Sequence, residues 1–253
     1  MIEYEKRGNV ALITINRPEA RNAVNGDVAE GIDAAIDKAE ADDEVWIGIL
    51  THEGPVFCAG ADLKAISSGD AARLATPTGG FGGITSKART KPIIAALNGP
   101  AYAGGCEIVL ACDLVVSSSE ATFGLPEVKR GLFAAAGGLL RLPRRLPLAV
   151  AMEIALTGDP ISADRAFELG LVNRVVPPGQ VLAEAMALAA SITANGPVAV
   201  RATLTMVREA KDLSEDEAWP RSNELAVQVF ATKDAIEGAT AFAEKRPPNW
   251  TGT

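Results

Sequence analysis

Two glutamates in this chain stand beside small or rigid backbone segments, where a carboxylate can be held still enough to transfer protons. Glu107 follows Gly104 and Gly105 at the start of an apolar stretch that suits a buried helix. Glu127 directly follows Pro126 in the segment ATFGLPEVKRGL, 20 residues further along. Two carboxylates within reach of one water molecule form a possible acid and base pair. Sequence spacing alone leaves open whether the two side chains meet.

Two backbone N–H groups in turns of small residues are candidates to bind an oxygen that gains negative charge. One belongs to Ala61, in the stretch FCAGADLK, and the other to Gly104, in the stretch NGPAYAGGCE. The amide of Gly104 also lies at the positive end of the expected helix. Two such donors converging on one carbonyl oxygen make an oxyanion hole, each worth roughly 2.7–4 kcal/mol in the transition state. The alternatives are a tight surface turn at FCAGADLK and close helix packing with Glu107 as a cap.

Other catalytic chemistries find less support among the residue types. His52 is the only histidine, so His-rich metal sites are excluded and we expect no metal. The chain has no GxSxG nucleophile elbow and no Walker loop, and the glycines of GGFGGITS lack the dinucleotide-loop spacing. A hydrolase that uses Cys58 and His52 stays open as an alternative. It would be inhibited by thiol reagents and would need neither glutamate.

Composition and charge limit the class of protein and its partners. The 253 residues are 48% hydrophobic and 22% charged, which suits one large domain or one domain with an appended piece. A net charge of −8 argues against nucleic acid, and it requires a local basic patch for any anionic ligand. No apolar run reaches the ~18 residues of a membrane span, and the start MIEYEKRGNV lacks a signal-peptide pattern. Three cysteines without a CxxC pair fit the reducing cytoplasm.

The elements that must position these residues change character along the chain. In the first half, β-rich runs predict strands at Val10–Ile15, Val45–Thr51, Ile93–Leu97 and Leu114–Ser117, with a helix capped by Asn25 between the first two. The segment Ser67–Gly83 is rich in Pro and Gly and is predicted to be a mobile loop. An α/β core is therefore expected in this half.

The second half is predicted to be helical. Ala-rich helical patterns cover Pro147–Thr157, Val181–Ala194 and Val198–Ala210. Ser214 and Glu217 have capping-box spacing before a further helix, which Pro220 should break or kink. No sharp linker separates the two halves.

Taken together, these segments resemble the crotonase (enoyl-CoA hydratase/isomerase) superfamily over nearly the whole chain. The motifs that carry the resemblance are, in order, INRPEARNAV, FCAGADLK, NGPAYAGGCE, FGLPEVKRGL, LTGDPISADRAFELGLVNRVVP and GATAFAEKR. The resemblance implies an α/β fold of the ClpP/crotonase type, a spiral of ββα units with a helical C-terminal section. It divides the chain into a core at 1–195 and a helical trimerisation region at 196–253. It also implies a homo-oligomer, either a trimer or a dimer of trimers.

The resemblance further implies a substrate and a reaction. Family members bind an acyl thioester of coenzyme A and hold its thioester oxygen between two backbone amides, which match Ala61 and Gly104 here. The two catalytic glutamates of the hydratases match Glu107 and Glu127. Retention of both favours syn hydration of a 2-enoyl-CoA to a 3-hydroxyacyl-CoA, as in fatty-acid β-oxidation. No cofactor is implied, because coenzyme A is part of the substrate. We expect Glu107 to be the ionised partner, because of the helix dipole, and Glu127 to be the proton donor.

The resemblance also predicts which residues contact the substrate. Those along the coenzyme A path are Ala20, Arg21, Ala59, Asp62, Leu63 and Lys64, with Phe242 and Lys245 reaching it from the C-terminal helix of the same or a neighbouring subunit. The alternative for Arg21 and Lys64 is solvated surface charge. Phe133, Ala135 and the segment Ser67–Gly83 are expected to line the acyl pocket.

The chain departs from the family pattern at two places that bear on the acyl group. Ala134 and Ala135 replace the usual Pro-Gly after the second glutamate, and Ala103 stands where a third glycine is common. Straight-chain enoyl groups, a steroid side chain and crotonobetainyl-CoA all stay open as substrates. An isomerase that needs one glutamate and a non-catalytic CoA-thioester binder are the remaining alternatives.

Overall fold

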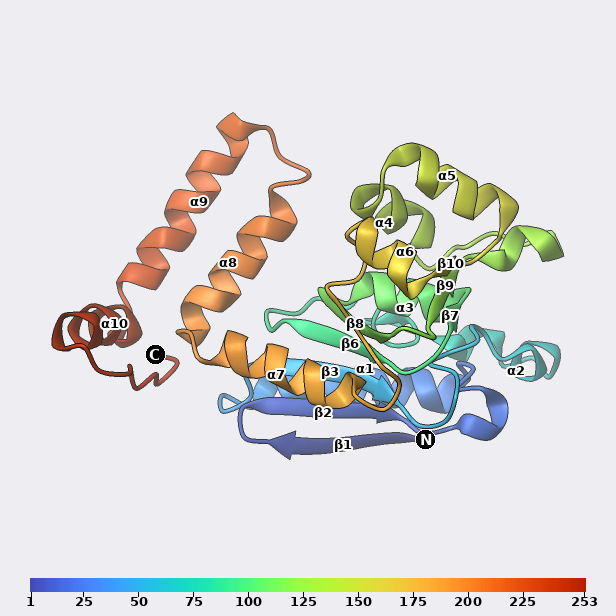
Figure 1. Cartoon of the computed structure of the whole chain (residues 1–253), viewed down its shortest axis with the longest axis horizontal. Helices are drawn as coiled ribbons and strands as arrows, with labels where there is room; N and C mark the ends of the chain where they lie inside the picture. Colours follow the sequence, from blue (N-terminus) through green and yellow to red (C-terminus); the bar gives the residue numbers. More distant parts are fainter.

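The computed structural model describes residues 1–253, and its centre is a six-stranded sheet (Figure 1). The strand order is β1-β2-β3-β6-β8-β11, and all neighbours run parallel except the antiparallel pair β1 and β2. The bounds are β1 Ile2–Arg7, β2 Val10–Ile15, β3 Ile47–His52, β6 Ile93–Leu97, β8 Leu114–Ser118 and β11 Arg174–Val176. The four central strands are almost entirely buried, as expected for a parallel sheet covered on both faces.

Helices cover both faces of this sheet because the side chains of each strand alternate between them. Ile13, Leu50 and Ala95 belong to the cluster that packs against α1 (Gly26–Ala41) and α3 (Gly104–Ala111). Leu12, Ile49 and Ile94 point to the other face and pack with α7 (Val181–Thr193). The sheet therefore gives α3, the helix that carries Glu107, a fixed apolar base.

A second, smaller sheet stands beside the first and gives the fold its spiral. It has the order β10-β9-β7, formed by Ile161–Ser162, Thr122–Gly124 and Ala101–Tyr102. Strand β6 continues into β7 and then α3, and β8 continues into β9 and then the helices α4 and α5, so a strand-strand-helix unit repeats. This repeat agrees with the predicted spiral of ββα units.

The remaining elements are short pieces around the core and a helical arm. Their bounds are α2 Leu63–Ser67, α4 Gly138–Arg145, α5 Leu148–Thr157, α6 Ala163–Glu168, α8 Pro197–Glu209, α9 Glu215–Phe230 and α10 Lys233–Glu244, with the strands β4 Ala75–Thr76 and β5 Gly80–Phe81 and the 3-10 turns Pro18–Ala20, Ala71–Leu74 and Pro126–Arg130. Figure 1 shows α8, α9 and α10 extending away from the sheet. No single helix is long and apolar enough to cross a membrane; only α7 and α8 taken together, with a bend of 104°, would pass that test.

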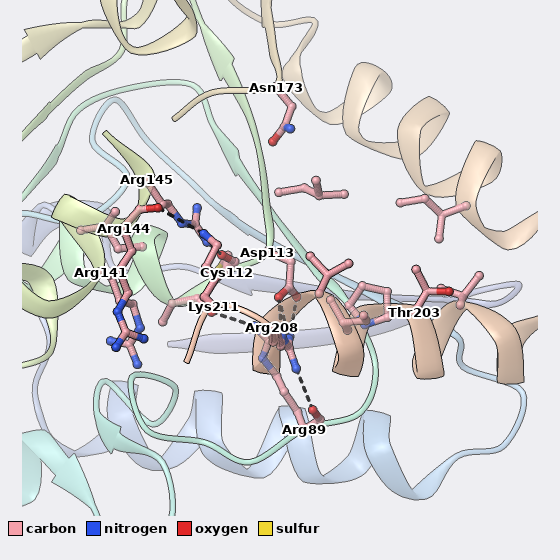
Figure 2. A pocket seen from close by; sticks show the side chains of 18 of the residues that line it. Arg89, Cys112, Asp113, Arg141, Arg144, Arg145, Asn173, Thr203, Arg208 and Lys211 are labelled. Atoms are coloured by element: carbon pink, nitrogen blue, oxygen red, sulfur yellow. Dashed lines mark hydrogen bonds and ion pairs between the residues drawn. The ribbon is translucent and has the colours of Figure 1, made fainter. Parts of the chain in front are cut away.

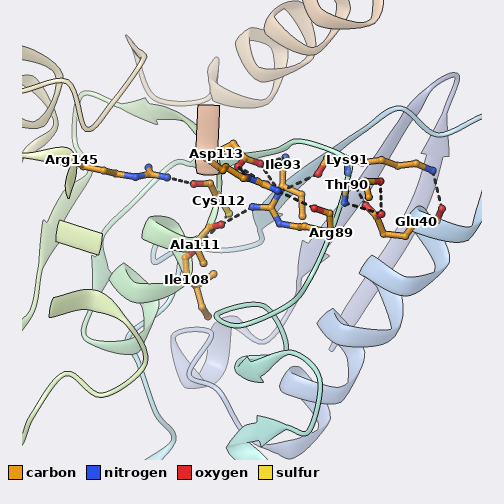
Figure 3. A network of polar contacts seen from close by, with 11 residues as sticks. Glu40, Arg89, Thr90, Lys91, Ile93, Ile108, Ala111, Cys112, Asp113 and Arg145 are labelled. Atoms are coloured by element: carbon orange, nitrogen blue, oxygen red, sulfur yellow. Dashed lines mark hydrogen bonds and ion pairs between the residues drawn. The ribbon is translucent and has the colours of Figure 1, made fainter. Parts of the chain in front are cut away.

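One largely buried carboxylate ties this arm to the core. Asp113 accepts hydrogen bonds from Arg208 on α8, with Nη2 to Oδ1 at 2.6 Å, and from Arg89 before β6, with Nη1 to Oδ2 at 2.5 Å. It also accepts the backbone N–H of Ile93 at 2.8 Å (Figure 3). Although burial acts to raise the pKa of Asp113, the two guanidinium groups lower it below its ordinary value.

Most local predictions agree with these elements, and two are wrong. Asn25 caps α1 by accepting the N–H of Val28 at 3.0 Å, and Ser214 and Glu217 form the expected capping box. Pro220 does not break α9, because a proline in the second turn removes only one backbone hydrogen bond and the helix continues. The kink at Pro220 stays a prediction. The segment Ser67–Gly83 is not an uninterrupted loop, since it contains a 3-10 turn and the β4–β5 hairpin.

Candidate active site

The two turns of small residues predicted to supply N–H donors lie against each other. The N–H of Phe57 donates to the carbonyl of Pro100 at 3.0 Å, and the N–H of Tyr102 donates to the carbonyl of Cys58 at 3.0 Å. A side chain on Gly105 would collide with the carbonyl of Cys58. Glycine is therefore required there for the close approach of the two segments.

The N–H groups of Ala61 and Gly104 donate no hydrogen bond within the chain. Their neighbours are engaged, since the N–H of Asp62 donates to the carbonyl of Val24 at 2.8 Å. Gly60 has φ of +100°, and a Cβ on it would lie 3.3 Å from the backbone nitrogen of Gly104. The turn before Ala61 thus touches the start of α3, and the two unengaged donors stand beside one another. This arrangement suits a carbonyl oxygen that gains negative charge.

Glu107 is buried at the start of α3, with only 3% of the residue exposed. Its Oε1 accepts hydrogen bonds from the backbone N–H groups of Ala136 at 2.8 Å and Gly138 at 2.9 Å. Burial raises the pKa of Glu107, and these two donors together with Arg141 act against that rise. The direction differs from the lowered pKa that the helix dipole alone predicts for Glu107.

Glu127 lies in the 3-10 turn Pro126–Arg130, where its Oε2 is buried without a hydrogen-bond partner. Burial raises the pKa of Glu127, and the charge of Glu107 raises it further. The two carboxyl groups are therefore close enough to interact, a point that sequence spacing leaves open. An unsatisfied buried oxygen costs about 1–3 kcal/mol, so a water molecule or a ligand group at this position would stabilise it.

Cys58 and His52 do not form the catalytic pair of the alternative hydrolase. Cys58 is completely buried, which raises the pKa of its thiol to about 12. The Nε2 atom of His52 accepts the backbone N–H of Asn98 at 3.0 Å, and its ring packs edge-on against Phe57. The hydrolase alternative is thus left without an available nucleophile or base.

Comparison with known proteins decides the family. The family model described as enoyl-CoA hydratase/isomerase matches residues 5–253. The chain belongs to the enoyl-CoA hydratase/isomerase family. The predicted resemblance to this superfamily is confirmed.

Solved structures and characterised relatives agree with this family assignment. The crystal structure of an enoyl-CoA hydratase from Mycobacterium tuberculosis is similar to this chain with a TM-score of 0.96 and 50% identity, covering 100% of this chain and 99% of the other. Enoyl-CoA hydratase EchA19 of the same species is 41% identical over 97% of this chain and 94% of its own length. Carnitinyl-CoA dehydratase of Proteus mirabilis is 39% identical over 97% of this chain and 96% of its own.

In this member of the enoyl-CoA hydratase/isomerase family, two segments predicted for coenzyme A lie side by side. The N–H of Ala59 donates to the carbonyl of Arg21 at 3.1 Å, which brings Ala20 and Arg21 next to the start of α2. The side chains of Arg21 and Lys64 are exposed and form no ion pair, so both are free to meet an anion.

Asp62 and Leu63 occupy the same surface in different ways. The carboxylate of Asp62 is engaged within the chain, because it accepts the N–H of Lys64 at 2.9 Å and pairs with Nη1 of Arg17 at 2.7 Å. It therefore holds the start of α2 in place. Leu63 is exposed at the first position of that helix. The Arg17–Asp62 pair is not predicted from the sequence, although Arg17 belongs to the INRPEARNAV motif.

Of the other residues predicted to contact the substrate, two lie near Glu107 and two lie far from the rest of the site. Phe133 and Ala135 are exposed in the segment just before Ala136, the residue that donates to Glu107. Phe242 and Lys245 lie at the end of α10, with Phe242 86% exposed, and Figure 1 places that helix far from α2. One copy of the chain does not bring these two residues to the other predicted contacts.

Sequence reasoning missed the two N–H donors that hold Glu107. Ala136 and Gly138 donate through their backbones, so their side chains carry no signal of the role. A Cβ on Gly138 would lie 2.9 Å from Cγ of Glu107. The Gly137-Gly138 pair was the one available hint of a close approach.

Proposed function

We propose that this chain is an enoyl-CoA hydratase, which adds water to the C2–C3 double bond of a 2-enoyl-CoA and yields a 3-hydroxyacyl-CoA. The observation that carries the proposal is the pair formed by the buried carboxyl group of Glu107 and the half-buried one of Glu127, whose Oε2 has no hydrogen-bond partner. The pKa values of both groups are raised. The unengaged N–H groups of Ala61 and Gly104 support it. Relatives named enoyl-CoA hydratase and short-chain-enoyl-CoA hydratase, 41% and 39% identical, point the same way.

The proposed mechanism begins at the thioester oxygen. Hydrogen bonds from Ala61 and Gly104 polarise the carbonyl group and make C3 electrophilic. The oxygen of one water molecule then bonds to C3, and the π electrons move onto the thioester oxygen as an enolate. The two N–H groups stabilise this charge as it develops, which lowers the barrier to addition.

The two glutamates complete the proton balance of the syn addition. We assign Glu107 as the carboxylate that takes a proton from the attacking water, because two N–H donors at Oε1 stabilise its charged form. Glu127 would deliver a proton to C2, since burial and the charge of Glu107 favour its neutral form and only its own backbone N–H favours the ionised form. After addition the proton on Glu107 passes to Glu127, which restores the starting protonation state of both groups, and the two titrate as a coupled pair.

Substrate binding follows from the charge of coenzyme A. Arg21 and Lys64 would meet its phosphate groups, with the adenine and pantetheine portions along Ala20, Ala59 and Leu63. Phe133 and Ala135 would line the acyl group. No cofactor is needed beyond the substrate, because proton transfer and oxyanion stabilisation account for the reaction.

A specialised acyl group is the second candidate. Carnitinyl-CoA dehydratases match this chain over nearly its whole length, at 39% and 38% identity. Loss of water from a 3-hydroxyacyl-CoA is the reverse of the same chemistry and needs the same two carboxyls. Ala134 and Ala135, where the family usually has Pro-Gly, make crotonobetainyl-CoA or a bulky side-chain enoyl-CoA the alternative substrates.

We also propose a homotrimer or a dimer of trimers in the cytoplasm, with 196–253 as the trimerisation region. Large apolar side chains are exposed on the arm, among them Trp219, Val227, Phe230 and Ile236. A neighbouring copy that covers them would also supply Phe242 and Lys245 to the coenzyme A path. Three free, buried cysteines fit a reducing compartment. The reaction would then be the hydration step of fatty-acid β-oxidation.

The test is loss of the enoyl-thioester absorbance with crotonyl-CoA and longer 2-enoyl-CoAs. Wild type should turn these over, and Glu107→Gln and Glu127→Gln should each lose at least ~10²–10⁴-fold in kcat. If only one variant loses activity, a one-glutamate isomerase is favoured. If wild type binds acyl-CoA but hydrates no chain length, the simple hydratase is rejected and the second candidate is tested with crotonobetainyl-CoA.

A further inference from the structure

A large cavity lies on a different part of the molecule from the candidate active site. It has a volume of about 1040 Å³ and is bounded by α8, by the C-terminal ends of α3 and α4, and by the segment before β6 (Figure 2). None of the residues predicted to contact substrate lines it. The cavity is therefore a separate feature that the proposed reaction does not use.

The lining of this cavity is strongly basic in a chain whose net charge is −8. Only one of the 32 Asp and Glu residues, Asp113, takes part in it. Its seven cations, out of the 24 Lys and Arg residues of the chain, are Lys87, Arg89, Arg141, Arg144, Arg145, Arg208 and Lys211. Like charges gathered in a partly buried site repel one another, so this arrangement calls for a counter-charge.

Four of these cations already have carboxylate partners. Arg89 and Arg208 share Asp113, as described above. Arg144 pairs with Asp212 at 2.7 Å, and Lys87 pairs with aspartates of α1. The cations without a carboxylate partner are Arg141, Arg145 and Lys211, which bond only to backbone carbonyl oxygens.

The three unpaired cations are held in place by those carbonyl groups. Arg141 donates to the carbonyls of Ala136, at 3.3 Å, and Thr85, while Arg145 donates to the carbonyl of Cys112. Burial lowers the pKa of Arg141, and repulsion by Arg145 lowers it further. Figure 2 shows Arg141, Arg144 and Arg145 gathered on the same side of the cavity.

We propose that this cavity is a binding site for an oxyanion, a phosphate or carboxylate group held by Arg141, Arg145 and Lys211. Guanidinium groups fixed by backbone carbonyls present preorganised N–H donors, and such donors bind oxyanions in strong, charge-assisted hydrogen bonds. Apolar residues of α8, including Leu204 and Val207, form part of the wall. An oxyanion carried on a small apolar body therefore matches both parts of the lining.

The site is connected to the candidate catalytic glutamate through one residue. Arg141 donates to the carbonyl of Ala136, and the N–H of the same residue donates to Oε1 of Glu107. An anion that draws Arg141 toward the cavity weakens its hold on this segment. An anion bound in the cavity would therefore act as an effector, changing the turnover number without contacting the substrate. This consequence rests on the proposed function.

The test is calorimetric titration of the intact wild-type oligomer with inorganic phosphate and, separately, with octanoate, at constant ionic strength and without substrate. Wild type should bind at least one of them, and comparing the two shows whether phosphate or carboxylate is preferred. Arg145→Gln should weaken binding roughly tenfold or more. Lys211→Gln, which changes an exposed side chain of the cavity wall, should weaken binding by a similar factor. Arg165→Gln, which changes an exposed arginine on α6 outside the cavity, should bind like wild type.

The proposal is overturned if wild type binds neither probe at millimolar concentration, or if the cavity variants bind as tightly as Arg165→Gln. A change in oligomer size in Arg145→Gln, with no anion bound by wild type, would likewise overturn it and show that a second copy fills the cavity. Binding is measured without acyl-CoA, so failure of the hydratase proposal leaves this result untouched. Failure to bind anions equally leaves the hydratase proposal untouched.

Discussion

Replacing Gly138 by alanine tests whether the backbone clamp on Glu107 serves catalysis. The added Cβ would lie 2.9 Å from Cγ and 3.0 Å from Oε1 of Glu107, and 3.1 Å from Cδ1 of Leu125. Leu125 is buried and cannot retreat, so the carboxyl group must move and lengthen its hydrogen bonds to the N–H groups of Ala136 and Gly138.

The size of the effect follows from those two bonds. A hydrogen bond to a charged group is worth about 1.5–3 kcal/mol, which corresponds to roughly ten- to a hundredfold in rate. We expect kcat on a 2-enoyl-CoA to fall by at least that factor if either bond is lost. KM should stay close to that of wild type, because the residues predicted for coenzyme A are on other segments.

The pH profile gives the same prediction an independent readout. The two N–H groups stabilise the charged form of Glu107, so weakening them raises its pKa further. The acidic limb of the profile of kcat/KM should therefore move to higher pH in Gly138→Ala. A merely less stable protein would lose activity without this shift.

Gly196→Ala is the matched control for the added methyl group. Gly196 has φ of −58°, and a Cβ there would approach only Trp250, at an ordinary 3.6 Å. Both variants should be compared with wild type by initial rates and thermal unfolding. Equal kcat and an unchanged acidic limb in Gly138→Ala and Gly196→Ala would refute the reasoning.

Three further predictions concern stability and reactivity. Asp113→Asn should lower the free energy of unfolding by about 3–5 kcal/mol in chemical denaturation, because Arg89 and Arg208 lose their shared counter-charge. In wild type, the lowered pKa of Asp113 contributes stability that is fully present above pH 3.8, the ordinary pKa of the group. This stability should be lost as the pH falls through the lower pKa of the folded state. A stability unaffected by Asp113→Asn would contradict this. Cys58, whose thiol has a pKa of about 12, should resist N-ethylmaleimide at pH 8. If mass spectrometry detects modification of Cys58 in the native protein, its burial is contradicted. Ser214→Ala should cost about 0.5–2 kcal/mol in thermal unfolding and leave kcat unchanged, whereas Ser214→Thr, which keeps a cap, should cost less.

The parts of the fold that the sequence predicts are those with local causes. Val10–Ile15 and Ile93–Leu97 are strands with the predicted bounds, because continuous β-branched and apolar runs in a parallel sheet are buried on both faces. The capping box at Ser214 is likewise a contact between residues three apart. Two-residue strands such as β7 carry no periodicity, so only the neighbouring backbone reveals them.

The candidate site divides in the same way. The unobstructed amides of Ala61 and Gly104 are predictable, because small residues are needed wherever two backbone segments approach closely. The coupling of Glu107 with Glu127 depends on how separate elements pack, and the clamp on Glu107 uses backbone atoms that any residue carries. The basic cavity is least visible of all, since its cations come from positions as far apart as 87 and 211.

The anchoring of α8 has a consequence for how the chain is made in the cell. Asp113 has one arginine partner 24 residues earlier, Arg89, and another 95 residues later, Arg208. During synthesis the N-terminal part emerges and folds first, at a rate of roughly 5–20 residues per second. Arg89 can therefore neutralise Asp113 while Arg208 is still to be added. The sheet can therefore form with Asp113 already paired to Arg89, and the arm packs against the core last, when Arg208 joins this pair.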